Sequence, residues 1–485
     1  MDIKFLLNKA IKLHVRGKID KAEEIYKKII NADPSNIVSL NNLGSILNTK
    51  ENFEKALNLI NRALEIKPNY EDALNNKGNC LKGLSRFDDA IECYKKALIF
   101  KPDFVGALNN LANSYRVVGR TEEAIKIFNK VIELEPNYYE ALYNQGICFY
   151  SLNLFDEAKD NYEKAIKIKP DFVEAYYNLS LLQMLQGNYK EGIKNYEWRK
   201  KRKDKKYTQY NDDIEWIGDK DLKNKIIYIS KEQGLGDYIQ YCRYLPLVKN
   251  LGATILLDTP KILRPLIDTM NIDCVYFDDI KQIKFDYHCS IVSLALAFKT
   301  TLETIPSKEP YFFTPKNINH NWKKKLNGFD RLNIGLKWTG NSSYIDDKYR
   351  STTLNELKPL FNLPYDFHSL EIEYSKDDET LLQNTANLQC HKKDIIGLEN
   401  TAGLIENLDL VISVNTSVAH LTGALGKKLW VLLPSVPEYR WLLNRQDSPW
   451  YPKTKIYRQS TEGDWKNIID RVKQDLILLK KSKKL

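Results

Sequence analysis

The feature that most constrains the fold is a repeat of 34 residues that runs through the first two-fifths of the chain. Asparagine and proline both recur at this spacing, as Asn8, Asn42, Asn76, Asn110, Asn144 and Asn178, and as Pro34, Pro68, Pro102, Pro136 and Pro170. A fixed period of this length is typical of a solenoid of helix–turn–helix units. Because each unit buries its apolar face only against its neighbours, we expect the repeats to stack into one all-α domain.

Three further columns of the repeat indicate how its two helices pack. Small residues occupy one position on each helix, and bulky residues occupy a third position that faces them. The columns are Ala10, Gly44, Gly78, Ala112, Gly146, Ser180; Ala22, Ala56, Ala90, Ala124, Ala158, Gly192; and Tyr26, Ile60, Tyr94, Phe128, Tyr162, Tyr196. Proline ends each second helix because it cannot continue one. The sixth row has Asp204 in place of proline, so the array is predicted to end near residue 206.

A chain of 485 residues is too long for one hydrophobic core, so two or three domains are expected. Its net charge of +10 comes from two short runs. Residues 199–206 carry seven basic side chains and one acidic one, and residues 480–484 carry four lysines, which together account for the whole excess. We interpret the runs as a solvated helix end and a basic tail, and we expect no nucleic-acid partner.

Cysteine usage and the N-terminus indicate a cytoplasmic protein. The seven cysteines are scattered, odd in number and without a C-x-x-C pair, which argues for reduced thiols and against a disulfide framework or a zinc site. Residues 1–18 are amphipathic and already follow the repeat, so no signal peptide is expected. No segment approaches the ~18 apolar residues that a membrane span needs.

From about residue 222 the repeat gives way to short β-branched or apolar runs that alternate with helical stretches. This alternation predicts parallel α/β sheets. The clearest runs are Ile226–Ser230, Ala253–Asp258, Cys274–Asp278, Asn333–Trp338, Asp366–Glu371, Asp409–Val414 and Leu429–Pro434. The polar, proline-broken stretch 306–330 divides them into two Rossmann-like halves, which would bind ligands where loops leave the carboxyl ends of the strands.

The predicted organisation is therefore multidomain: an all-α solenoid, then an α/β pair of Rossmann-like halves. The solenoid covers residues 1–206 as six helix pairs, and a linker follows over 207–221. The first half is placed at 222–318, and the second at 319–479 with a closing C-terminal helix. Residues 480–485 form the basic tail.

The first candidate loop directly follows the run Ile226–Ser230. Gly234 and Gly236 let backbone N–H groups approach a ligand closely, and the helix start that follows favours an anion. Asp237 places a carboxylate at the rim of the predicted cleft. The alternative is a tight turn in which Asp237 only caps the helix.

The second candidate loop follows the run Asp409–Val414. It begins at Asn415, and the hydroxyls of Thr416 and Ser417 open a helix, as in a phosphate-binding helix start. His420 lies about one turn further along the helix. The alternative interpretation is simple capping by the hydroxyls together with a structural histidine.

A third candidate loop follows the run Asn333–Trp338, and its members are Trp338, Gly340 and Asn341. Lys348 and Arg350 come shortly after this loop and have the charge to neutralise a diphosphate. The neighbouring aspartates Asp346 and Asp347 suggest a metal site. Because no third ligand follows at a usable spacing, we expect no metal.

The 34-residue pattern resembles the tetratricopeptide repeat over all six rows. By this resemblance the first helices line a concave groove, and the asparagine column lies on it. An asparagine side chain can both donate to and accept from a peptide backbone, so the column would hold an extended peptide. The predicted groove residues are Asn42, Asn76, Asn110, Asn144 and Asn178. The alternative is that asparagine only bonds locally at this repeat position.

Four motifs of the second half strongly resemble those of bacterial tetratricopeptide-repeat glycosyltransferases. They read G-L-G-D-Y-I-Q-Y-C-R-Y-L-P, I-G-L-K-W-T-G-N, D-L-V-I-S-V-N-T-S-V-A-H-L-T-G-A-L-G and R-W-L-L-N-R-Q-D-S-P-W-Y-P. The catalytic part is similar to the heptosyltransferases of lipopolysaccharide synthesis, which have the GT-B fold. The overall plan is also similar to that of protein O-GlcNAc transferases.

This resemblance implies roles for individual residues. Asp237 matches the aspartate proposed as general base, and Lys348 or Arg350 matches the basic residue on the donor phosphates. The donor-diphosphate loop is matched by Thr416, Ser417 and His420. That loop usually begins with aspartate, whereas this chain has Asn415, which removes a charge. The other loop residues assigned to donor binding are Gly234, Gly236, Trp338, Gly340 and Asn341.

The functional expectation is an inverting, metal-independent transferase that moves a hexosyl- or heptosyl-type sugar from a nucleotide-sugar donor. No cofactor is expected beyond this donor, and the expected acceptor is a protein or peptide held by the repeat groove. Displacement leaves a nucleoside diphosphate, so the site must stabilise leaving-group charge, and the acceptor needs a base. Two alternatives stay open, a scaffold with an inactive transferase domain and a transferase for glycan acceptors, and so does the oligomeric state.

Overall fold

The computed structural model describes residues 2–202, 212–279, 284–307, 310–329, 331–340, 347–435 and 438–482. The chain forms two compact units, Met1–Ala175 and Tyr176–Leu485. The predicted loop residue Asn341 and the neighbouring Asp346 lie outside the described ranges, as do parts of the predicted linker and basic tail.

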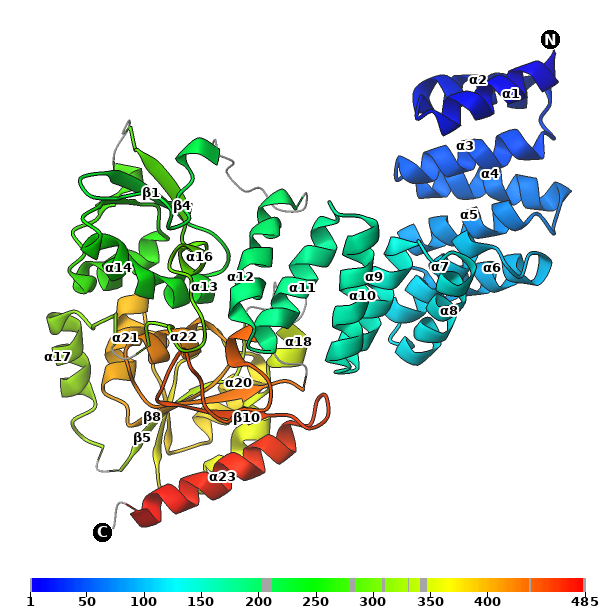
Figure 1. Ribbon diagram of the computed structural model, residues 1–485. Helices are drawn as coiled ribbons and strands as arrows, with labels where there is room; N and C mark the ends of the chain where they lie inside the picture. The colour runs from blue at the N-terminus through cyan, green and yellow to red at the C-terminus, as the bar shows by residue number, and fades with distance from the viewer. Residues whose placement is uncertain are drawn as a thin grey trace. The chain divides into compact units, whose positions relative to one another are not determined.

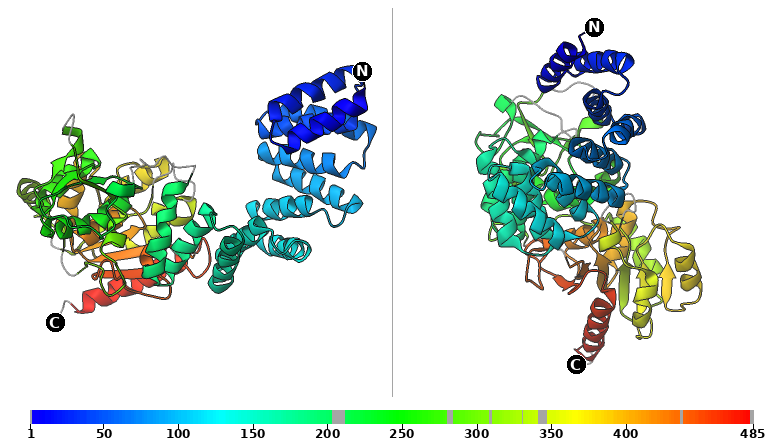
Figure 2. Two further views of the ribbon diagram at one scale, coloured as in Figure 1. Left: turned by 45° about the horizontal axis from the view of Figure 1, so that its top comes forward. Right: turned by 90° about the vertical axis from the view of Figure 1, so that its right-hand side faces the viewer.

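The first unit is a succession of helix pairs in chain order (Figure 1). The two helices of a pair pack against each other, and each second helix packs against the first helix of the next pair. Figure 2 shows the same succession from two further sides. The helices are α1 (Ile3–Val15), α2 (Ile19–Ala32), α3 (Ile37–Thr49), α4 (Phe53–Ile66), α5 (Glu71–Gly83), α6 (Phe87–Phe100), α7 (Val105–Val117), α8 (Thr121–Leu134), α9 (Tyr139–Ser151) and α10 (Phe155–Ile168).

The small residues lie where the two helices of a pair approach each other, as predicted. A Cβ built on Gly78 would lie 2.5 Å from the ring of Tyr94, and one on Gly146 would lie 2.7 Å from the ring of Tyr162. Both tyrosine side chains are buried. Because any side chain at these glycines would push the helices apart, the small and bulky columns act as one packing device.

The turn inside each pair has a regularity that the sequence analysis missed. A residue with φ between 58° and 89° recurs every 34 positions, at Gly17, Glu51, Ser85, Gly119, Asn153 and Gly187. A left-handed residue is a common way to end a helix, because it directs the next N–H groups back to the last carbonyls. Glycine adopts this conformation without strain, whereas Glu51 and Ser85 are held in it by the helices on either side.

The sixth row forms α11 (Val173–Leu185) and α12 (Tyr189–Tyr196), so the described repeat region contains twelve helices. The last of these packs within the second unit. Trp450 Nε1 donates to Tyr189 Oη at 2.8 Å, and the rings of Tyr196 and Tyr439 lie 6.2 Å apart. The compact units therefore divide at Ala175, earlier than the predicted end of the solenoid at residue 206.

The second unit contains a four-stranded parallel sheet in the order β3-β2-β1-β4. Its strands are β1 (Ile226–Ser230), β2 (Thr254–Leu257), β3 (Val275–Tyr276) and β4 (Tyr287–Ser290). The helices that accompany them are α13 (Leu235–Tyr241), α14 (Leu245–Asn250), α15 (Arg264–Ile267) and α16 (Leu294–Ala297). β1 lies inside the sheet and is an apolar run, as expected for a parallel strand that is covered on both faces.

A six-stranded parallel sheet follows in the order β10-β9-β8-β5-β6-β7. Its strands are β5 (Asn333–Lys337), β6 (Asp366–Ser369), β7 (Leu388–Cys390), β8 (Leu410–Val414), β9 (Leu429–Leu433) and β10 (Thr454–Arg458). If β5 is counted as strand 1, the strands of this sheet follow the doubly wound order 3-2-1-4-5-6. The first sheet has the order 3-2-1-4, which is a shorter form of the same arrangement. The winding direction reverses between β1 and β4 and between β5 and β8, and ligands of such sheets bind at the carboxyl ends of these strands.

Helices lie on both faces of the second sheet, with α22 on one side and α23 on the other in Figure 1. They are α17 (Lys316–Lys325), α18 (Asp347–Arg350), α19 (Leu354–Leu357), α20 (Lys376–Gln383), α21 (Leu398–Glu406), α22 (Ser417–Ala424) and α23 (Trp465–Ser482). The long helix α23 packs against α19 and β10. All seven runs predicted as strands contain one, and the sequence analysis missed β4, β7 and β10.

Candidate functional site

The reversal points of the two sheets come together at α13 and α22, which pack against each other. α13 follows β1 and α22 follows β8, so each helix begins at the carboxyl end of a strand where the winding reverses. The helices approach closely at Gly236, where a Cβ would lie 2.8 Å from His420 Cδ2. Glycine at this position therefore allows two of the predicted loops to meet.

Asp237 is positioned from two directions. Its Oδ2 accepts a hydrogen bond from the backbone N–H of Gly234 at 3.3 Å, so the side chain does cap its helix. Its Oδ1 forms an ion pair with Nη2 of Arg440. The side chains of Asp237 and Arg440 are 16% and 15% exposed, so the pair lies at the edge of solvent.

Arg440 opens the motif R-W-L-L-N-R, and the sequence analysis gave it no role. Its Nη1 pairs with Glu438 Oε2 at 2.7 Å. Its buried Nε donates to no acceptor within the described residues. Burial acts to lower the pKa of Arg440, but the charge of Asp237 above all outweighs it and raises that pKa well above the usual value. Arg440 is therefore a permanent cation between two carboxylates.

His420 is buried, with 4% of its surface exposed. Its Nδ1 lies 2.9 Å from Tyr451 Oη, and its ring stacks on Trp441 with 5.6 Å between the ring centroids. Burial, and then the charges of Arg440 and Arg243, lower the pKa of His420 well below its usual value. The ring is therefore neutral, and it packs beside Gly236 as an uncharged side chain that is hydrogen-bonded to Tyr451.

The loop that begins α22 keeps its polar groups satisfied despite the change from aspartate to asparagine. Asn415 Oδ1 accepts a hydrogen bond from Trp441 Nε1 at 2.9 Å. An indole N–H can donate a hydrogen bond to an amide oxygen as well as to a carboxylate oxygen. Thr416 makes no capping bond to the helix, and its Oγ1 lies 3.3 Å from Ser413 Oγ instead. Ser417 and Val418 begin α22, and the N–H groups at a helix start have no acceptor inside the helix, whereas that of Ala419 already donates to the carbonyl of Thr416 at 3.0 Å.

The loop after β5 is held by a buried carboxylate that the sequence analysis missed. Glu371 is 1% exposed and accepts hydrogen bonds from the N–H groups of Trp338 and Thr339 at 2.9 and 2.7 Å. It also forms an ion pair with Lys337. A carboxylate at the end of the run that contains β6 was the available signal, because such positions face the carboxyl edge of the sheet.

Arg350 lies next to this loop, as the donor-site prediction requires. Its Nε pairs with Asp347 Oδ1 at 2.9 Å. A Cβ on Gly340 would collide with both of these side chains, and the N–H of Gly340 donates to Ser351 Oγ at 2.7 Å. Lys348 belongs to the same short helix, α18. Asp347 is thus engaged with protein groups, whereas its sequence neighbour Asp346 and the predicted loop residue Asn341 are outside the described ranges.

The basic run 199–206 was predicted to be a solvated helix end. This prediction was wrong for its first residue, Arg199. Arg199 is fully buried, and its Nη2 lies 2.8 Å from Oε2 of Glu232 and 2.8 Å from Oγ of Ser293. Glu232 follows β1 and Ser293 follows β4. Arg199 therefore ties together the two loops at the reversal point of the first sheet, a role that its charge alone did not reveal.

The asparagine column of the solenoid takes part in bonds between neighbouring repeats. Its members Asn42, Asn76, Asn110, Asn144 and Asn178 are all half-buried. Asn76 Nδ2 donates to Asn41 Oδ1 at 2.9 Å, and Asn110 Nδ2 donates to Asn75 Oδ1 at 3.0 Å. Local bonding, the alternative interpretation, is present in these rows, and peptide gripping stays a prediction.

Three further properties concern the described part of the chain. All seven cysteines are free thiols. No group of three His, Cys, Asp or Glu side chains within the described ranges is arranged to hold a metal ion. No helix described here combines the length and the apolar composition needed to cross a bilayer.

Similar proteins are known for parts of the chain. Protein FlbA of Caulobacter vibrioides is 23% identical over an alignment of 288 residues that covers 53% of this chain and 47% of FlbA. The chain thus spans about half the length of this curated relative.

Similar solved structures include MamA and YrrB, the latter described as a TPR protein with an unusual peptide-binding site, and each is 23% identical to this chain. MamA covers 33% of this chain and 94% of its own length at a TM-score of 0.30, and YrrB covers 36% and 91% at 0.31. PilF of Pseudomonas aeruginosa is 17% identical and covers 40% and 87% at 0.36.

Family models match the repeat rows directly. Residues 37–70, 71–104, 103–171 and 161–194 each match a model of the tetratricopeptide repeat. These ranges run through rows two to six of the 34-residue pattern and coincide with the helix pairs that begin at α3. The repeat region of this chain is therefore a tetratricopeptide-repeat solenoid.

Proposed function

We propose that the chain is an inverting glycosyltransferase with a GT-B arrangement, in which the four-stranded sheet forms the acceptor half and the six-stranded sheet the donor half. The observation that carries this proposal is the packing of α13 against α22. Ligands of doubly wound sheets bind where the winding reverses. Because the reversal points of the two sheets lie together, one site can hold a donor on one sheet and an acceptor on the other, as transfer between two substrates requires.

The donor half has the groups that a departing diphosphate needs. The first turn of α22 supplies backbone N–H groups and the positive end of a helix dipole. Arg350 supplies positive charge beside the loop after β5, and Lys348 belongs to the same helix. Fixed donors and cations of this kind stabilise developing negative charge without a metal ion.

Asp237 acts as the general base in this proposal. Its carboxylate takes the proton of the acceptor hydroxyl or amide while the acceptor atom bonds to the anomeric carbon. The bond from that carbon to the diphosphate oxygen breaks at the same time, and the nucleoside diphosphate leaves with both bonding electrons. One direct displacement inverts the configuration at this carbon.

Arg440 determines when Asp237 is available. In the structure its guanidinium holds Oδ1 of Asp237, the oxygen that does not cap the helix. A diphosphate carries more negative charge than this carboxylate and matches the planar donors of a guanidinium well. Arg440 would therefore turn toward the bound donor and release Oδ1 for the acceptor proton. The buried Nε of Arg440 is a further donor for that phosphate.

The acceptor in this proposal is a protein or peptide that the repeats present to the transferase site. Tetratricopeptide repeats form extended binding surfaces because each repeat adds a similar face to the next. Peptide binding by the repeats also fits the asparagine column, whose amides bond a backbone of any sequence. The donor sugar is taken to be a hexose or heptose on a nucleoside diphosphate.

The experiment that tests this function is a thermal-shift screen of the full chain with nucleoside diphosphates and nucleotide sugars, followed by a hydrolysis assay with those that bind. Binding stabilises the native state by mass action, about 2.7 kcal/mol at a hundredfold excess over Kd. We expect binding and turnover to persist in excess chelator. Strict dependence on a divalent metal would overturn the metal-independent proposal.

A second candidate function is a repeat scaffold with an inactive transferase domain. Two observations favour it. The donor loop begins with the neutral Asn415, and the carboxylate of Asp237 is engaged in an ion pair with Arg440. A scaffold of this kind binds nucleoside diphosphates weakly or not at all and turns over no sugar. The same screen therefore separates the two candidates.

A further inference from the structure

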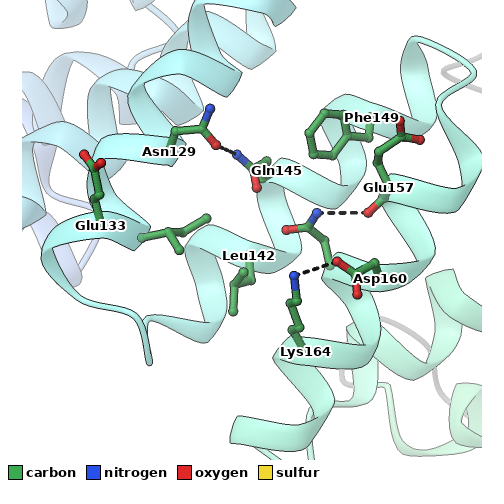
Figure 3. Close-up of a pocket in the computed structure, with 10 residues that line it drawn as sticks. Asn129, Glu133, Leu142, Gln145, Phe149, Glu157, Asp160 and Lys164 are labelled. Atoms are coloured by element: carbon green, nitrogen blue, oxygen red, sulfur yellow. Dashed lines mark hydrogen bonds and ion pairs between the residues drawn. The ribbon is translucent and has the colours of Figure 1, made fainter.

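The first unit has a cavity of about 600 Å³, and none of its lining residues belongs to the proposed transfer site. Residues from α8, α9 and α10 line it (Figure 3). This volume is within the range of pockets that bind small ligands or single side chains of a partner. Its lining is unusual for a packed repeat, because amides and carboxylates outnumber the apolar side chains.

Two buried amides of this cavity stand at repeat positions where several other rows hold apolar residues. Gln145 is in the column of Leu43, Leu111 and Leu179; Lys9 and Lys77 complete that column. The four side chains Leu43, Leu111, Gln145 and Leu179 are equally buried, each 4% exposed. Asn161 is 7% exposed and stands in the column of Ile25, Leu59, Cys93 and Ile127; Asn195 completes that column.

A buried amide is unfavourable unless its polar atoms find partners. In both amides only the nitrogen has one: Gln145 Nε2 donates to Asn129 Oδ1 at 2.6 Å, and Asn161 Nδ2 donates to the carbonyl of Glu157 at 2.9 Å. Figure 3 shows the first of these bonds. Within the described residues, neither amide oxygen accepts a hydrogen bond. Two acceptors thus line the cavity without a protein donor, where leucine and isoleucine would have filled the space.

The rim of the cavity is acidic. It carries the carboxylates of Glu133, Glu157 and Asp160 and one lysine, Lys164, whose Nζ is paired with Asp160 at 2.6 Å. Within the described lining, neither Glu133 nor Glu157 forms an ion pair. Amide oxygens below and carboxylates above both favour a donor with positive charge.

We propose that this cavity binds the guanidinium of an arginine side chain on a partner protein. A guanidinium has five N–H donors in one plane, which suits two amide oxygens and a carboxylate together. The apolar members of the lining, Leu142, Phe149 and Ile132, would contact the aliphatic stem of that side chain. The site does not depend on the transferase function, because its residues belong to the first unit alone.

The test uses the full chain and two small probes, N-acetyl-arginine methylamide and its neutral citrulline counterpart, in saturation-transfer NMR titrations. We expect the arginine probe to bind saturably in low salt and the citrulline probe to bind at least about tenfold more weakly, the loss expected when a charged hydrogen-bond donor becomes neutral. Glu157→Gln should weaken the arginine probe to a similar extent. Glu163→Gln makes the same change on an exposed residue of α10 outside the cavity and should leave binding unchanged.

A double variant separates binding from packing. Gln145→Leu with Asn161→Ile restores the apolar residues of both columns, so it should keep or raise the melting temperature while it abolishes binding of the arginine probe. The proposal is overturned if this variant still binds the probe, or if the citrulline probe binds as well as the arginine probe. It is also overturned if Glu163→Gln and Glu157→Gln weaken binding equally, or if the arginine probe shows no saturable binding to the unmodified chain.

Discussion

Asp237 and Arg440 are 203 positions apart in the sequence, yet their side chains form an ion pair that joins the first sheet to the segment after β9. Each partner is also held by a second group, Asp237 by the backbone of Gly234 and Arg440 by Glu438. The pair lies beside the contact between Gly236 and His420, so three features of the candidate site converge here. The first predictions concern this convergence.

Replacing Asp237 by Asn should abolish transfer and leave nucleotide binding near normal. The amide keeps the shape of the side chain, and its single oxygen can still accept one of the two bonds, from Gly234 or from Arg440, but it cannot take a proton from the acceptor. Loss of a general base lowers rates by ~10²–10⁴. The measurement is turnover beside nucleotide affinity. A variant that keeps more than about half of the turnover would show that Asp237 is only a helix cap.

Arg440→Gln should weaken the binding of a nucleoside diphosphate by about 1.5–3 kcal/mol, the range for a hydrogen bond to a charged group. The affinity for the nucleoside without phosphates should not change, because Arg440 is proposed to contact the diphosphate alone. The conservative Arg440→Lys should recover part of the affinity. Equal losses for nucleoside and nucleoside diphosphate, together with a lower melting temperature, would assign Arg440 a purely structural role.

Gly236→Ala should lower stability by about 1–3 kcal/mol and reduce turnover, because its methyl group must displace the buried ring of His420. Gly234→Ala is the matched control two residues away. A Cβ there would lie 3.6 Å from Asp237 Oδ2, which is an ordinary contact, and the backbone is in the extended region. Thermal unfolding and turnover of the two variants decide the matter: similar losses in both would mean that Gly236 is needed only for backbone freedom.

Acid should destabilise the second unit before its carboxylates titrate. Burial above all lowers the pKa of His288 to about 4 and that of His391 to about 4. These rings are neutral when folded, whereas the unfolded chain binds protons below pH ~6.5, so stability falls as pH drops from that value toward 4. Each histidine contributes a loss of about 2 kcal/mol at pH 5.

The measurement for this prediction is the melting temperature at pH 7 and at pH 5. His288→Gln should reduce the difference between the two values, since its side chain no longer titrates. His320→Gln, on an exposed residue, should leave the difference unchanged. A difference that is the same in all three proteins would show that the buried histidines do not determine the acid sensitivity.

The strands that sequence reasoning found and those it missed differ in a physical property. Central strands such as β1 are apolar on both faces and stand out as continuous runs. β7 and β10 form the two edges of the second sheet, and β4 and β3 form those of the first, so all three missed strands are edge strands and β3 is the edge strand that was found. An edge strand is exposed along one side, so it tolerates the lysine and arginine of β10 and the short, polar sequence of β7.

The candidate loops could also be predicted from local sequence, whereas the residues that contact these loops from distant segments could not. Glycine after a strand has a local meaning, so Gly234, Gly236 and Gly340 could be found from spacing alone. Arg199, Glu371 and Arg440 act through contacts with distant segments, and in the sequence each is one charged residue among many. Only the fold shows that Arg199 is buried against Glu232 and that Glu371 holds the loop after β5.

The last prediction asks whether the asparagine column binds the acceptor or only joins the repeats. If the column holds a peptide, Asn76→Ala with Asn110→Ala should reduce transfer to a protein acceptor while donor hydrolysis is unchanged. These substitutions also remove two bonds between repeats, each worth about 0.5–1.5 kcal/mol, so the melting temperature should fall as well.

The matched control removes the same two bonds from the other side, as Asn41→Ala with Asn75→Ala. This variant loses a comparable amount of stability but keeps the column intact. Peptide delivery therefore requires that transfer falls in the first variant and not in the second, with melting temperatures lowered in both. Equal transfer rates in the two variants would mean that the column serves packing alone, and the acceptor would then be sought among glycans, which need no grip on a peptide backbone.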